Sequence, residues 1–168
     1  MSDPGTQLTA CIPRLRRYAR ALVGERGGAD DLVQDTVERG WSRIAEWRRD
    51  GEMRAWLFGI MHNLYVDSLR ARRLQTTSLD EETPHPALAD HTARLEIRDM
   101  DCALALLPVE QREILLLVGL EGMTYDQVAG ALGLPLGTVM SRLSRGREKL
   151  RNLMEGRAAP GVSLQVVK

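Results

Sequence analysis

Apolar residues recur along the chain at the three- and four-residue spacing of amphipathic helices, and no segment alternates convincingly as a strand would. Leu15, Tyr18, Ala19 and Leu22 form the first such stripe, and Gly24 follows it in the position of a helix C-cap. The pattern predicts an all-α fold whose first helix ends near Gly24.

Two further helices are predicted before the middle of the chain. We expect the second to open at Asp30 and Asp31, because acidic residues stabilise the positive end of a helix dipole. Its expected apolar face comprises Val33, Val37, Trp41 and Ile44. A long third helix is predicted from about Glu52 to Arg73, with a buried stripe of Met53, Trp56, Leu57, Ile60, Met61 and Leu64.

Helical periodicity is lost over residues 74–92, which are rich in Thr, Ser, Asp and Glu and contain two prolines. Such a composition is typical of an exposed, flexible linker. Beyond it, a helix with an apolar set of Leu95, Met100, Ala103, Leu104 and Leu107 is expected to stop at Pro108. A core helix over residues 110–120 follows, and residues 158–168 form a loose tail. The simplest architecture is two small helical domains, residues 1–73 and 93–157, joined by a linker.

The segment after residue 123 has the signature of a helix-turn-helix. Thr124 suits an N-cap, Gly133 allows a tight left-handed turn, and Pro135 suits the start of a second helix. Ala129 and Val139 flank the turn at offsets that let two helices cross at about a right angle. We therefore predict a helix-turn-helix over residues 124–150.

The second helix of this motif is basic. Its N-terminal half would enter a major groove, so Ser141, Ser144 and Arg145 are the candidates for contacts with base edges. The candidates for phosphate contacts are Arg142, Arg147, Lys149 and Arg151. A merely solvated basic helix in an ordinary bundle is the alternative, which the coincidence of turn geometry and charge disfavours.

The formal net charge is zero, with 23 basic and 23 acidic residues, but the charges are segregated. Residues 1–73 have a net charge of +3, residues 74–99 of −4 and residues 100–168 of +1. The two cysteines and three histidines have no metal-ligand spacing, so we expect no disulfide framework, metal or cofactor. No catalytic constellation is present, which disfavours an enzyme. Neither a signal peptide nor a membrane span is recognisable, so we expect a soluble, cytoplasmic protein.

Three segments resemble sigma factors of the extracytoplasmic-function (ECF) group. GTVMSRLSRGREKL resembles the closing GTV-x-SR-x-x-RAR-x-x-L signature of that family, and ADDLVQDTVERGW resembles its core-binding helix. AWLFGIMHNLYVDSLRARR is similar to the family's WL-x-x-IA-x-N-x-x-x-D-x-x-R-x-x-R segment. Together they cover nearly all of the predicted helical chain, in the family's order. The resemblance implies sigma region 2 in the first domain and sigma region 4 in the second.

The resemblance also implies partners and sites. The acidic face of the second helix would bind the clamp helices of the largest subunit of core RNA polymerase; it comprises Asp31, Gln34, Asp35 and Glu38. The polymerase flap and promoter DNA are further expected partners. The residues expected to recognise and melt the minus-ten element are Trp47, Arg48, Asn63, Arg70, Arg72 and Arg73. The helix-turn-helix would read the minus-thirty-five element. The family also implies an anti-sigma factor, expected to be membrane-linked.

Two residues depart from the family pattern: Met140 replaces a basic residue, and Gly146 replaces Ala. We expect Met140 to change the preferred DNA sequence and Gly146 to weaken its helix. Two other functions stay open. A helix-turn-helix repressor would dimerise, and no dimer helix is evident. A sigma mimic that only sequesters an anti-sigma factor would lose its DNA-contacting arginines, yet Arg142, Arg145 and Arg147 are present. The acidic linker is expected to imitate nucleic acid in the polymerase channel.

Overall fold

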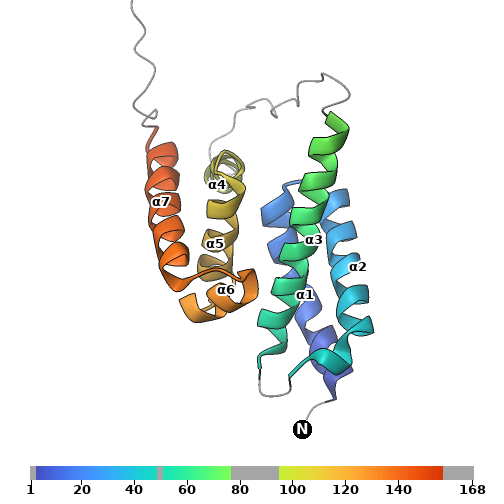
Figure 1. Ribbon diagram of the computed structural model, residues 1–168. Helices are drawn as coiled ribbons and strands as arrows, with labels where there is room; N and C mark the ends of the chain where they lie inside the picture. The colour runs from blue at the N-terminus through green and yellow to red at the C-terminus, as the bar shows by residue number, and fades with distance from the viewer. Residues whose placement is uncertain (1–2, 49–50, 77–94, 157–168) are drawn as a thin grey trace, which may run out of the picture.

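The computed structural model describes residues 3–48, 51–76 and 95–156. Within these ranges the chain forms seven α-helices and one 3-10 helix, without a strand, which confirms the all-α prediction. The first group comprises α1 (Pro4–Val23), α2 (Arg26–Ser42), η1 (Ile44–Glu46) and α3 (Met53–Thr76). The second group comprises α4 (Leu95–Ala105), α5 (Val109–Gly119), α6 (Tyr125–Leu132) and α7 (Leu136–Met154). Figure 1 shows the two groups side by side. The predicted linker centre and tail lie outside the described residues.

The ends of the first two helices are set by capping residues. The carboxylate of Asp3 accepts a hydrogen bond from the Thr6 amide at 3.2 Å, and α1 ends at Gly24, whose φ is +78°. Gly24 therefore ends the helix as predicted. α2 begins earlier than expected, because Glu25 caps it by accepting from the Gly28 amide at 2.9 Å. Asp30 and Asp31 consequently lie one turn inside the helix.

The core of the first group is built on the predicted stripe of α1. Leu15, Tyr18, Ala19 and Leu22 are all buried, and the ring of Tyr18 packs edge-on against Phe58 of α3 with centroids 4.9 Å apart. Burial of the Tyr18 hydroxyl raises its pKa well above the ordinary value. An aromatic pair in this geometry adds to the area that the two rings bury.

The expected apolar face of α2 is wrong at Trp41, whose side chain is 59% exposed. The buried side of this helix instead comprises Ala29, Leu32, Val33, Thr36 and Gly40. At Gly40 an added Cβ would lie 2.7 Å from the Leu57 side chain, so α2 approaches α3 through small residues. Trp41 is left on the outside of this close contact.

In the second group the buried residues come from all four helices: Ala103 and Leu104, Ile114 and Leu117, Val128 and Leu132, and Val139 and Leu143. Met100, one of the apolar residues of α4, is 38% exposed. Gly146 is buried where α7 crosses α5, and an added Cβ would lie 3.0 Å from Leu115 and 3.3 Å from Gln111. This glycine serves close helix packing.

The two groups of helices pack against each other. The predicted architecture of two domains joined by a linker did not include this contact. Helix α3 lies against α6, and α1 lies against α4 and α5. α3 also continues to Thr76, three residues beyond the predicted domain end. None of the described helices combines the length and apolar character that a membrane span requires.

Candidate polymerase and nucleic-acid interfaces

The helix-turn-helix is formed by α6 and α7 as predicted. The Thr124 hydroxyl accepts from the Gln127 amide at 3.2 Å, and the Gln127 side chain accepts from the Thr124 amide at 2.9 Å. This reciprocal pair is a capping box, which fixes the first turn of α6. Gly133, with φ +64°, then makes the left-handed turn, and Pro135 precedes α7. The backbone thus holds α7 at a fixed angle to α6.

Val139 and Leu143 anchor α7 in the core, and this orients the residues expected to contact DNA. Most of those residues are exposed: Ser141, Ser144, Arg145, Arg147, Lys149 and Arg151. Arg142 differs, because it is half-buried and lines a groove shared with α3. The face of α7 available to a major groove therefore has serines and arginines at its centre, with further basic residues toward its C-terminal end.

The acidic face of α2 is exposed along its whole length. Asp31, Gln34, Asp35 and Glu38 all face solvent, and the Gln34 amide donates to the Glu38 carboxylate at 3.0 Å. Trp41 follows Gln34 and Glu38 at helical spacing, so its exposed indole lies at the end of the same face. Sequence reasoning missed this aromatic residue because apolarity alone had placed it in the core.

The residues expected to act on the minus-ten element divide into two sets. Trp47 is buried, with 8% of its side chain exposed, and its indole N–H has no hydrogen-bond partner among the described residues. Its ring is therefore not available to a base in this conformation, contrary to the expectation. The other expected contacts are exposed: Arg48, Asn63, Arg70, Arg72 and Arg73. Asn63 and Arg70 are seven residues apart and share one face of α3.

A buried carboxylate, Glu121, connects the second group to α1 and α3. Its side chain accepts two hydrogen bonds from the Arg17 guanidinium, at 2.8 and 3.1 Å, although only 3% of the residue is exposed. Arg54 donates to the backbone carbonyl of the same residue at 2.8 Å. Side chains of α1 and α3 therefore meet at one residue of the α5–α6 connection.

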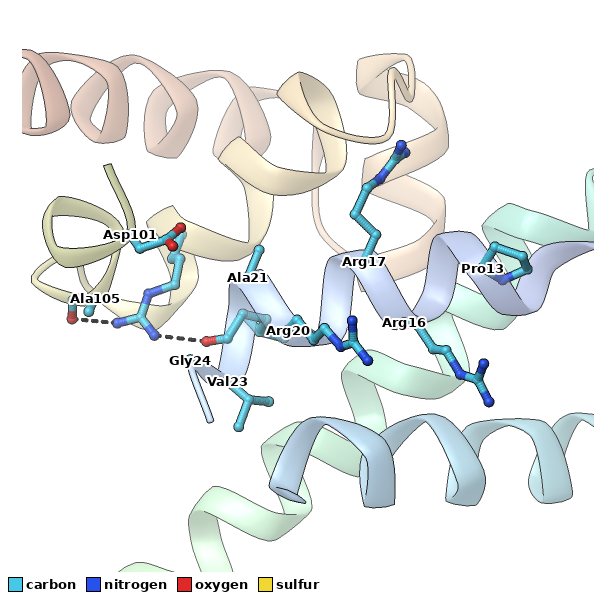
Figure 2. Close-up of a pocket in the computed structure, with 11 residues that line it drawn as sticks. Pro13, Arg16, Arg17, Arg20, Ala21, Val23, Gly24, Asp101 and Ala105 are labelled. Carbon is cyan, nitrogen blue, oxygen red and sulfur yellow. Dashed lines mark hydrogen bonds between the residues drawn. The ribbon is translucent and has the colours of Figure 1, made fainter. Parts of the chain in front are cut away.

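A second buried carboxylate, Glu113 of α5, lies 2.9 Å from the Nδ1 atom of His62 on α3. Near the other end of α1, Arg112 donates to the carbonyls of Leu22, Leu104, Ala105 and Leu107, at 2.7 to 3.0 Å. Figure 2 shows the cavity at this junction, where Arg16 and Arg20 of α1 point away from Arg17. The contact between the groups is thus rich in charged and polar pairs.

The backbones of the two groups approach closely at Gly59 of α3. An added Cβ there would lie 2.9 Å from the carbonyl oxygen of Ala131 on α6. Beside this contact a groove of about 940 Å³ separates α3 from α5, α6 and α7. Its basic lining comes from both predicted DNA-binding helices: Arg70, Arg72 and Arg73 of α3, and Arg142 of α7.

Two family descriptions match the chain. Residues 8–62 match the Sigma2 domain of PhyR, and residues 97–150 match Sigma-70, region 4. The ECF RNA polymerase sigma factor EcfG of Rhodopseudomonas palustris is 37% identical over 149 residues, covering 88% of this chain and 82% of that protein. SigE of Mycolicibacterium smegmatis is 36% identical and covers 84% of this chain and 57% of that protein.

Solved structures agree with these matches. The sigma factor RpoE in complex with the anti-sigma factor NepR, from Bartonella quintana, has a TM-score of 0.79 and 32% identity over 89% of this chain and 95% of that one. CnrH in complex with the cytosolic domain of CnrY has a TM-score of 0.67 and 27% identity over 92% of this chain and 89% of that one. With both groups of helices matched and a relative 37% identical along 82% of its length, the chain belongs to the ECF RNA polymerase sigma factors.

Proposed function

We propose that this sigma factor joins core RNA polymerase through the acidic face of α2 and directs the enzyme to promoters with α3 and α7. The observation that carries the proposal is the separation of charge: an exposed acidic face on α2 and exposed arginines on α3 and α7. Acidic side chains suit the basic residues of a partner helix, whereas arginines suit phosphates and guanine. In this proposal the clamp helices of the largest subunit bind α2, and the flap binds the second group.

The minus-ten contacts are assigned to Arg48, Asn63 and the three arginines near the end of α3, without Trp47. The minus-thirty-five contacts are assigned to the exposed face of α7, as the sequence predicts. We assign no catalytic step to the chain, since its part in initiation is recognition and strand opening. Action on core polymerase and DNA places the protein in the cytoplasm.

Promoter binding requires the two groups to separate. Elements named for positions ten and thirty-five lie about 25 base pairs apart, which is roughly 85 Å of B-form DNA at about 3.4 Å per base pair. Arg142 of α7 and the α3 arginines instead line one groove of about 940 Å³. The two helices cannot reach both elements from this arrangement, so we propose that it is the form of the protein off the promoter.

We further propose control by an anti-sigma factor. Two of the similar structures are complexes in which a sigma factor is bound to NepR or to the cytosolic domain of CnrY. A partner of this kind would cover the exposed face of α2 or hold the two groups together. Either action would keep the protein from polymerase. The cytosolic domain of CnrY supports a membrane-linked partner.

A sigma mimic that only captures an anti-sigma factor is the second candidate, and the match of residues 8–62 to the Sigma2 domain of PhyR favours it. The two candidates differ in whether α7 contacts DNA. A mimic has no use for the exposed Arg145 and Arg147, and both are present in a helix that the turn at Gly133 holds in place. This observation supports the sigma factor over the mimic.

Run-off transcription with purified core polymerase tests the proposal. We expect a promoter-specific transcript, lost in Asp35→Arg through weaker polymerase binding and in Arg145→Ala through weaker promoter binding. The matched control is Asp30→Arg, an exposed acid of α2 that faces Arg20 at 4.0 Å rather than the proposed polymerase face. If the wild-type protein yields no promoter-specific transcript but still binds an anti-sigma factor, the mimic is the correct function.

A further inference from the structure

The N-terminal half of α7 exposes apolar side chains on the face that would enter DNA. Leu136 is 42% exposed and Met140 is 51% exposed, and the two are one helical turn apart. Tyr125 of α6, 36% exposed, lines the same hollow as Met140 and Ser144. These three side chains are not part of the buried core, so DNA can cover them without disturbing the packing of the protein. Apolar side chains exposed together in this way often mark a binding surface.

The two polar residues that directly follow Met140 in the sequence are engaged or turned aside. The Ser141 hydroxyl donates to the Thr138 carbonyl at 3.1 Å, and Arg142 is half-buried at the groove shared with α3. Gly137, one turn before Ser141, has open space where a Cβ would stand, so the backbone can approach a groove edge closely. At Met140 itself α7 therefore offers a base pair an apolar group, and the polar Ser144 and Arg147 follow one and two turns further along the same side.

Among the base-pair edges in the major groove, only thymine presents an apolar group, its C5-methyl. We infer that Met140 reads a thymine methyl in the minus-thirty-five element, an inference that rests on the function proposed above. Arg147, seven residues and about two turns after Met140, lies on the same side of α7 and lines the same hollow, whereas Arg145 is turned about 140° away around the helix axis.

Selection and single-methyl deletion test the inference. A library with a randomised minus-thirty-five region is selected by run-off transcription with the holoenzyme, and each selected thymine is then replaced by deoxyuridine. This replacement removes the methyl group and leaves the hydrogen-bonding edge unchanged. At one thymine we expect transcription to fall about fourfold when holoenzyme is subsaturating. This factor corresponds to the binding free energy contributed by burying one methyl group.

The assignment to Met140 is tested with Met140→Ala, which should transcribe the thymine and deoxyuridine templates equally. The matched control is Met154→Ala, because Met154 is also exposed on α7, at its far end, and should keep the fourfold ratio. A ratio of one at every selected thymine in the wild type would overturn the inference while leaving the sigma-factor function intact. A fourfold ratio that persists in Met140→Ala would show another residue reading the methyl. Absence of any promoter-specific transcript would overturn both proposals.

Discussion

Replacing Gly59 by Ala should separate the two groups of helices without damaging either one. The added Cβ would stand 2.9 Å from the Ala131 carbonyl oxygen, whereas ordinary van der Waals contact begins at 3.4 Å, so α3 and α6 must move apart. Overpacking of this kind costs about 1–3 kcal/mol. The same substitution adds about 1 kcal/mol of helix stability to α3, but it does so whether the groups are together or apart. The equilibrium should therefore shift toward separation by about 5- to 150-fold.

Gly130→Ala is the matched control. Gly130 lies in α6, beside Ala131, and an added Cβ there meets nothing within 4 Å. It should gain helix stability of the same order, without changing the contact between the groups. Gly130→Ala should consequently unfold at a slightly higher temperature, and only Gly59→Ala should alter the arrangement.

Two measurements together decide the outcome. If a sizeable fraction of the wild-type protein is already open, Gly59→Ala should enlarge the radius of gyration in small-angle X-ray scattering. If the open fraction is very small, the apparent affinity for core polymerase should rise by the same factor as the equilibrium, because only the open form binds. Unchanged scattering and unchanged affinity in Gly59→Ala would refute the contact at Ala131 or the need to open it.

Three other predictions concern single side chains. Arg17→Ala should weaken the closed arrangement by about 1–3 kcal/mol, because it leaves the buried Glu121 carboxylate without its 2.8 Å partner. A double-mutant cycle with Glu121→Ala should give a clear coupling energy between the two residues. Simple additivity of the two substitutions would contradict this prediction. Trp41→Ala should weaken core-polymerase binding about tenfold, whereas Leu74→Ala, which removes an even more exposed apolar residue of α3, should not; equal affinities would exclude Trp41 from the interface. Burial raises the pKa of the Cys11 thiol, so it holds less thiolate at a given pH and should be alkylated more slowly than the exposed Cys102 at pH of about 8, as mass spectrometry can measure; equal rates would count against the burial.

Apolar periodicity and turn chemistry predicted the helices of this protein well, because those signals act within a few residues. The caps at Thr124 and the turns at Gly24 and Gly133 depend on local φ and on neighbouring amides, and all three are as expected. Apolarity failed at Trp41 because the buried side of α2 uses Thr36 and Gly40, whose small size lets α3 approach. A tryptophan is a far stronger apolar signal than a threonine or a glycine, so the sequence pattern favoured Trp41 for the core.

The contact between the groups could not be read from the sequence for a different reason. Glu121 and Glu113 resemble ordinary surface acids, and their partners Arg17 and His62 are 104 and 51 residues away along the chain. Burial of a carboxylate depends on a partner that only the three-dimensional fold supplies. Gly59 likewise looks like a weak point in a helix until Ala131 of α6 is placed against it.

The chemistry of this contact suits an interface that must come apart. Paired charges at a buried interface add little net stability, because the cost of removing them from water offsets much of their attraction, yet they fix orientation well. When the groups separate, Glu113 and Glu121 regain water, so opening exposes no unpaired buried charge. An interface of leucines alone would instead present a large apolar surface to solvent on opening. The charges that cancel in the composition thus fit the proposed change, in which the two groups are together when the protein is off the promoter and apart when it is bound there.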